Sequence, residues 1–178
     1  KVLKHHVQAL GAMSPDDVEV ASAHIAKAIE TATDLITDAP AWFEHLADLV
    51  GLDTQSTRRA TPSYREGPTW NEQVRPTLST ISSAIYKTIR PLQDLMNVLD
   101  SQPKRTSDPH IQSIFELSRA LRRLTQKAAF LSAYAAPNDQ TVSWLERDRG
   151  HRSVPAARLL DAPIEVGDML REQLFETM

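Results

Sequence analysis

The sequence contains no cysteine and only five glycines among its 178 residues. The lack of cysteine excludes disulfides, thiolate zinc sites and cysteine-ligated iron–sulfur clusters within this chain. Eleven prolines against five glycines indicate many helix starts and ends rather than flexible linkers. A hydrophobic content of 41% with 24% charged residues is typical of one globular domain with a core, and we expect a single domain over residues 1–178.

Long hydrophobic runs are also missing. No apolar segment approaches the roughly 20 residues needed to span a bilayer, and the N-terminal "KVLKHHVQAL" lacks the apolar stretch of a signal peptide. We therefore expect no membrane contact, and the lack of cysteine fits a cytoplasmic protein. The chain begins with Lys1 and ends with "LFETM". Neither end resembles a natural terminus, so we expect a piece of a longer protein.

Catalytic and cofactor motifs are absent as well. The sequence has no P-loop, G-x-G-x-x-G, H-E-x-x-H, EF-hand loop or G-x-S-x-G motif. Of its six histidines, His5 and His6 are adjacent and the other four are scattered without an i,i+4 partner of ligand type, which favours surface histidines over a metal site. We predict no catalytic residue, no metal site and no cofactor site in this chain, so any enzymatic activity depends on the longer protein.

Most of the apolar residues recur with a helical period. The motif "SPDD" predicts a helix start, because Ser14 can cap free backbone N–H groups and Pro15 suits the first turn. This helix is expected to reach about residue 32, and a second, short helix is expected from about Ala39 to Gly51. The polar stretch Leu52–Thr69 then predicts an irregular loop. Its arginines either touch a ligand or belong to a mobile solvated surface, and they are Arg58, Arg59 and Arg65.

Two heptad patterns dominate the middle of the chain. One set is Leu78, Ile85, Leu92 and Leu99 with Val74, Ile81, Thr88 and Leu95, and the other is Ile114, Leu121, Ala128 and Ala135 with Leu117, Leu124 and Leu131. Such patterns predict two long helices with matching apolar seams. A loop of about ten residues joins them, which favours an antiparallel helical hairpin. Pro91 should bend the first of these helices.

The segment "TVSWLERDRGHRSVPAARLLDAPIEV", residues 141–166, differs from the rest of the chain. An alternating run around Trp144, a charged turn with Gly150 and a second extended run predict a short β-ribbon. A final helix is expected after Gly167. The predicted fold is therefore mainly α, a helical domain with a long antiparallel helical hairpin and a short β-ribbon near the C-terminus.

The charge distribution offers candidate binding residues. The net charge is −3, yet residues 104–152 carry nine basic and five acidic side chains. The candidates lie on the second hairpin helix, away from its seam, and in the ribbon turn. They are Arg119, Arg122, Arg123 and Lys127, and Arg147, Arg149 and Arg152. They form either a surface that contacts phosphates or an ordinary solvated face. Trp144 is similarly either a stacking platform for a base or part of the core.

The C-terminal third resembles a known family. "VSWLE", a second strand and the block "APIEVGDMLREQLF" at 162–175 resemble the segment of DinG-type, XPD-like superfamily 2 helicases just before their "TSATL"-like motif. "MSPDDVEVASAHIAKAIE" at 13–30 resembles, more weakly, the segment after the DEAH box. The two matches cover about 55 residues well or moderately and bracket the chain in the right order.

The resemblance implies an Arch-like insertion domain, with residues 160–178 leading back to the motor domain. The parent would be an ATP-dependent 5′-to-3′ DNA helicase of DNA repair that uses ATP and Mg²⁺, neither of which this chain would hold. The implied partners are single-stranded DNA and the motor domains of the same chain. Two other hypotheses stay open, a protein-interaction module without nucleic-acid binding and a helical regulator that dimerises through its seams.

Overall fold

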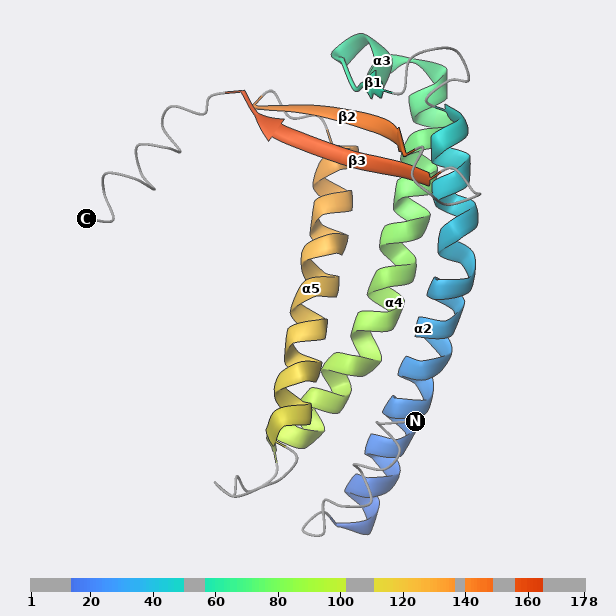
Figure 1. Cartoon of the computed structure of the whole chain (residues 1–178). Coiled ribbons are helices and arrows are strands. Elements are labelled where there is room, and N and C mark those ends of the chain that lie inside the picture. Colours follow the sequence, from blue (N-terminus) through green and yellow to red (C-terminus); the bar gives the residue numbers. More distant parts are fainter. Residues whose placement is uncertain (1–13, 50–56, 102–110, 137–139, 149–155, 165–178) are drawn as a thin grey trace, which may run out of the picture. The chain divides into compact units, whose positions relative to one another are not determined.

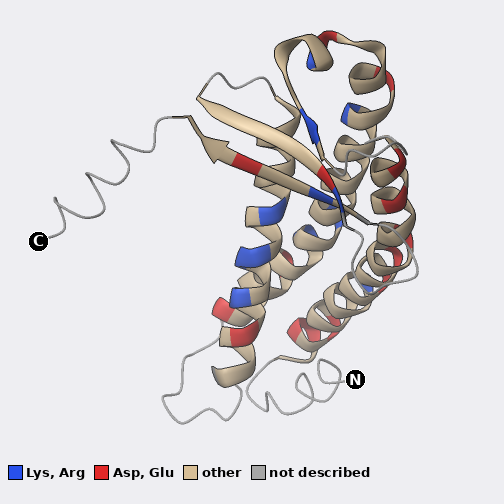
Figure 2. Cartoon of the chain, turned by 45° about the horizontal axis from the view of Figure 1, so that its top comes forward, with Lys and Arg blue, Asp and Glu red and all other residues tan. Residues whose placement is uncertain are grey.

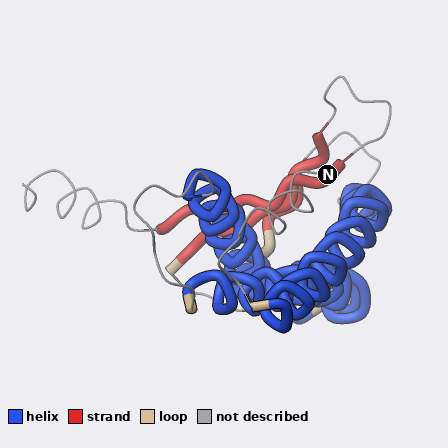
Figure 3. Tube along the Cα trace, turned by 90° about the horizontal axis from the view of Figure 1, so that it is seen from below, coloured by secondary structure: helices blue, strands red, loops and turns tan. Residues whose placement is uncertain are grey.

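A computed structural model describes residues 14–49, 57–101, 111–136, 140–148 and 156–164. The elements follow in the order α2 (Pro15–Leu49), β1 (Thr57–Arg59), α3 (Pro62–Glu66), the π-helix η1 (Trp70–Val74), α4 (Arg75–Asp100), α5 (Ile111–Ala135), β2 (Thr141–Asp148) and β3 (Ala156–Pro163). Helices predominate, and the three strands form one sheet (Figure 1, Figure 3). The predicted mainly α fold with two long helices and a β-ribbon is confirmed.

The chain divides into two compact units, and each of the long helices contributes residues to both. The first unit comprises residues 1–38 and 80–130, and the second comprises residues 39–79 and 131–178. The single domain expected over residues 1–178 stays a prediction.

The first unit has a core to which three helices contribute. Its fully buried members are Ala21 and Ile25 of α2 and Leu95 of α4. Partly buried apolar residues pack around them, namely Val18, Val98, Leu99 and Leu117, the last of these on α5. Because each helix presents apolar residues at three- and four-residue spacing, all three can bury one face in the same place.

Two hydrogen bonds fix the direction of α5 against α4. The Ser82 hydroxyl donates to the carbonyl of Ala128 over 3.5 Å, and the Ser118 hydroxyl lies 3.9 Å from the Met96 sulfur. The residue number increases from Ser82 to Met96 on α4, whereas that of the partner decreases from Ala128 to Ser118 on α5. These parts of the two helices are therefore antiparallel. The predicted seam on α4 is buried at Leu78, Ile81, Ile85, Thr88, Leu92 and Leu95. The helix continues through Pro91, and its expected bend there stays a prediction.

The N-terminal prediction of two separate helices is wrong. Residues 15–49 form one continuous helix with Pro40 inside it. Proline removes one backbone hydrogen bond, but the helix can continue where neighbouring groups compensate. The polar residues between the two expected helices therefore lie on a helix rather than in a loop.

The irregular loop expected over Leu52–Thr69 contains regular structure. Strand β1 covers residues 57–59, and helix α3 begins at Pro62. The Thr61 hydroxyl accepts a hydrogen bond from the Tyr64 backbone N–H, so Thr61 caps α3 and Pro62 occupies its first turn. This Thr-Pro pair is a helix-start signal that the sequence interpretation missed.

The ribbon prediction is confirmed, and a third strand joins it. β2 pairs antiparallel with β3 from Thr141↔Pro163 to Asp148↔Ala156, and β1 pairs antiparallel with β2 on its other side. Within β2 the buried residues are Ser143 and Leu145, whereas Trp144 between them is half-buried. Since alternate residues of a strand face opposite sides, Trp144 lies on the face opposite the buried pair. The helix expected after Gly167 falls outside the described residues.

Candidate nucleic-acid interface

Four basic residues of α5 lie together on an exposed face of the first unit. Arg119, Arg122, Arg123 and Lys127 are all exposed, as the heptad pattern predicted. Their spacing of three and four residues places them on adjacent turns of one helical face. Within the part of the chain that the structure describes, none of them forms a salt bridge. Figure 2 shows the basic residues gathered along this helix. Their charges are therefore available to an anionic ligand.

An exposed phenylalanine accompanies these charges. The Phe115 side chain is 64% exposed, and Phe115 precedes Arg119 by four residues and Arg122 by seven. Residues at i, i+4 and i+7 share one helical face, so an aromatic ring and two guanidinium groups form one exposed row. The sequence interpretation missed Phe115. Its signal was present, however, because Phe115 occupies the same outward heptad position as Arg122.

One acidic residue lies close to this row. Glu116 follows Phe115 on the exposed surface, and its carboxylate accepts a hydrogen bond from the Gln112 side chain over 3.2 Å. The charge of this part of α5 is still dominated by the four cations, since no other acidic residue occurs between Ile111 and Ala135. The row with Phe115, Arg119 and Arg122, flanked by Arg123 and Lys127, is called the α5 basic face below.

The ribbon arginines differ from the α5 basic face. The side chain of Arg147 is 18% exposed and lies 3.8 Å from a carboxylate oxygen of Asp48, whose side chain is 58% exposed. An anionic ligand would have to compete with Asp48 for this guanidinium. Arg149 and Arg152 fall outside the described residues. The ribbon therefore supplies no exposed group of arginines within the described residues.

In the second unit, Arg65 is held between the short helices and the end of α5. Its Nε donates to the carbonyl of Ala60 over 3.2 Å, and its Nη1 donates to the carbonyls of Tyr134 and Ala136 over 2.9 and 2.7 Å. The guanidinium also lies 4.7 Å from the centroid of the Trp70 ring. The interpretation of Arg65 as part of a mobile solvated loop is therefore wrong, and the residue joins segments far apart in sequence.

Burial affects the ionisable groups around Arg65. Desolvation lowers the pKa of Arg65 from its ordinary value, and the nearby Tyr134 opposes this shift. Desolvation also raises the pKa of Tyr134, with Arg65 acting in the opposite direction and with Tyr64 and Asp161 adding to the rise. Arg65 stays a cation at neutral pH, because a guanidinium starts far above that range.

Neither a metal-holding cluster nor a membrane-spanning helix occurs among the described residues. No group of three or more histidine, aspartate or glutamate side chains lies close enough to hold a metal ion in the described ranges. Likewise, no described helix combines the length and the apolar character that crossing a bilayer requires.

Comparison with known proteins adds no relative. No protein-family model, no curated protein and no solved structure matches this chain.

Proposed function

We propose that this chain is a helical module that contacts single-stranded DNA through the α5 basic face, as an Arch-like insertion of a DinG-type, 5′-to-3′ DNA helicase. The observation that carries the DNA contact is the row of unpaired cations beside the exposed Phe115. The chain would guide the strand and carry out no catalysis itself.

The length of the α5 basic face suits a nucleic-acid backbone. Arg119 and Lys127 are eight residues apart, which corresponds to about 12 Å along a helix axis. A strand carries one phosphate per 3.4 Å in a duplex and fewer when it is stretched, so this length covers roughly two or three phosphates. Arginine and lysine contacts to phosphates carry no sequence information. Such contacts suit a protein that must let a strand slide past.

The exposed phenylalanine favours a single strand over a duplex. Every base has an aromatic surface that can stack on a phenyl ring, and this stacking is available only when the base is not enclosed in a helix. A ring next to two guanidinium groups can therefore bind a base while the arginines bind its neighbouring phosphates. Stacking and phosphate contact are both independent of sequence.

The helicase assignment rests on sequence resemblance. It is supported by the segments at 13–30 and 141–178 and by their order along the chain. A long helical hairpin that supplies a stiff element, followed by a ribbon that returns the chain, is compatible with an insertion between two motor motifs. The ATP and Mg²⁺ of such an enzyme would be held by the motor domains, since no ATPase motif occurs in this sequence.

Charge reversal tests the proposal in this chain. The triple variant Arg119→Glu, Arg122→Glu and Arg123→Glu should lower affinity for a fluorescent thymidine oligonucleotide at least tenfold at low salt, because three phosphate contacts become repulsive. The matched control reverses three exposed cations of α4 and changes the net charge equally, namely Arg75→Glu, Lys87→Glu and Arg90→Glu. Equal affinity of the wild type and the α5 variant would refute the proposal.

One specific observation favours the alternative hypothesis of a protein-interaction module. Ile36 of α2 is 74% exposed and Ile29, seven residues earlier on the same helical face, is 38% exposed. Exposed apolar residues on one face are a feature of partner-binding helices. If the wild-type chain binds no oligonucleotide, this face becomes the better candidate for the function.

A further inference from the structure

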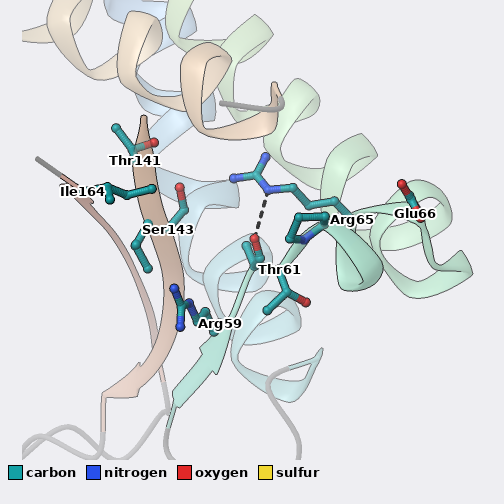
Figure 4. A pocket seen from close by; sticks show the side chains of 10 residues that line it. Arg59, Thr61, Arg65, Glu66, Thr141, Ser143 and Ile164 are labelled. Atoms are coloured by element: carbon teal, nitrogen blue, oxygen red, sulfur yellow. Dashed lines mark hydrogen bonds between the residues drawn. The ribbon is translucent and has the colours of Figure 1, made fainter. Parts of the chain in front are cut away.

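The second unit contains a cavity beside the sheet that the proposed function does not use. It measures about 450 Å³ and lies between the start of β2 and the segment that connects β1 to α3. Arg59 and Arg65 contribute to one wall, and Thr141, Ser143 and Ile164 contribute to the other (Figure 4). Its size falls within the range of small-molecule sites, which runs from about 300 to 1,000 Å³.

Arg65 brings a cation without a carboxylate partner into this cavity. Its hydrogen bonds go to backbone carbonyls, through Nε and Nη1. Within the described ranges no acidic group lies within salt-bridge distance of it, and its Nη2 donates no hydrogen bond. The carbonyls stabilise the cation without neutralising its charge, so a guanidinium at the cavity wall can still bind an anion from solution.

Ser143 supplies a second and independent feature. The residue is only 4% exposed, and its carbonyl accepts the Ala60 backbone N–H over 2.8 Å, which fixes its position. Its hydroxyl lines the cavity and makes no hydrogen bond to any residue that the structure describes. In Figure 4 this hydroxyl lies on the side of β2 that faces the Arg65 guanidinium. A serine hydroxyl at this place can donate a hydrogen bond to an anion in the cavity.

The remaining lining residues define the kind of ligand. Arg59 adds a second cation, and Glu66 is the one acidic residue of the lining. Figure 4 shows the Glu66 carboxylate directed away from Ser143. Val142, Pro62 and Ile164 provide apolar surface. The cavity thus combines two guanidinium groups and a hydroxyl donor with apolar walls, which suits a small organic molecule that ends in an oxyanion.

We propose that this cavity binds the phosphate or carboxylate group of a small molecule, through Arg65, Arg59 and the Ser143 hydroxyl. Phosphate and carboxylate share the chemistry that these donors recognise, because both accept paired hydrogen bonds from a guanidinium group. The site lies in the second unit and does not rest on the proposed DNA contact of α5.

Titration with simple anions tests this site in the full chain. The probes are inorganic phosphate and acetate, added at constant ionic strength against chloride and followed by NMR at the arginine Nε–Hε and backbone amide signals. We expect saturable shifts at Arg65 and Ser143 with phosphate, with acetate or with both, and the stronger of the two identifies the ligand group. Shifts that do not saturate, or that chloride reproduces, would overturn the proposal.

Two variants test whether the NMR shifts arise from an anion bound in the cavity. Ser143→Ala removes only the hydroxyl, and we expect it to weaken binding of the anion about tenfold, the effect of one hydrogen bond to a charged group. Arg59→Gln should weaken it by a similar factor. Arg58→Gln is the matched control, because Arg58 is exposed on the same strand but lies over the Tyr64 ring and outside the cavity. The proposal would also be overturned if Ser143→Ala and Arg59→Gln bound the anion as tightly as the control Arg58→Gln.

Discussion

The guanidinium of Arg65 lies over the indole ring of Trp70, 4.7 Å from its centroid. The same guanidinium donates to the carbonyls of Tyr134 and Ala136, residues that follow it by 69 and 71 positions. A cation in contact with an aromatic face and with backbone carbonyls is stabilised both by the ring electrons and by hydrogen bonds. Arg65 therefore connects α3, η1 and the C-terminal end of α5 within the second unit.

Replacement of Arg65 should destabilise the protein. We expect Arg65→Met to lower the free energy of unfolding by about 2–4 kcal/mol, because several charge-assisted hydrogen bonds and the contact with Trp70 are lost. Urea denaturation followed by tryptophan fluorescence measures the change. Arg58→Met is the control, since this exposed arginine only lies over the Tyr64 ring, and its effect should stay below about 1 kcal/mol. Equal losses of unfolding free energy in the two variants would show that the contacts of Arg65 do not stabilise the second unit.

Tyr134 should make the protein sensitive to alkaline pH. Burial raises the pKa of Tyr134 above its ordinary value of 10.0, so the folded protein holds the phenol proton more tightly than the unfolded chain. The resulting contribution to stability is complete below pH 10 and is lost as the pH rises further. Denaturation midpoints between neutral and alkaline pH measure this loss.

The Tyr134→Phe variant isolates the effect of that phenol. Its stability should fall less steeply above pH 10 than that of the wild type. Tyr86→Phe is the control, because Tyr86 is 47% exposed and should leave the slope unchanged. Identical slopes for the wild type and Tyr134→Phe would contradict the buried position of this ring.

The three-helix core of the first unit depends on Leu95. Leu95 is 1% exposed and packs with Ala21 and Ile25. Leu95→Ala should cost about 2–5 kcal/mol of unfolding free energy through lost burial and the cavity that it leaves. Val20→Ala, at a residue of α2 that is 46% exposed, should cost less than about 0.5 kcal/mol. Comparable costs at the two positions would mean that this core is packed differently.

Phe115 should contribute to binding of single strands through stacking. We expect Phe115→Ala to weaken the complex with a thymidine oligonucleotide by about 1–3 kcal/mol, the usual contribution of one stacked base. Affinity for a duplex of the same length should change much less, because paired bases are not available for stacking. Fluorescence anisotropy with both ligands provides the measurement. Tyr86→Ala, which removes an exposed aromatic ring from α4, should leave both affinities unchanged.

The helical hairpin was predictable because its determinants are local and repeated. Leu78, Ile85 and Leu92 recur every seven residues, and the helix that carries them buries them on one face. The outward position of Arg122 followed from the same pattern on α5. The continuity of α2 was missed for the opposite reason. Pro40 is a strong local signal for a helix boundary, yet here the helix extends through it.

The second unit was harder to predict because its contacts are distant in sequence. β1 has only three residues, and its partner strand β2 begins more than 80 residues later. The polar stretch around Arg58 contains no sequence signal that predicts the pairing of β1 with β2. In the sequence Arg65 resembles any other loop arginine, since two of its three acceptor carbonyls belong to Tyr134 and Ala136. The cavity beside Ser143 depends on the same long-range contacts, so only the three-dimensional structure brings its donors together.

The salt dependence of oligonucleotide binding tests the role of the α5 basic face most directly. For single strands, the logarithm of the affinity falls with the logarithm of the salt concentration with a slope of about −0.7 for each neutralised phosphate. Loss of Arg119, Arg122 and Arg123 as contacts should therefore reduce the magnitude of the slope by about 2. The α4 control variant should keep the wild-type slope. An unchanged slope in the α5 variant, at an unchanged affinity, would contradict DNA binding by this face.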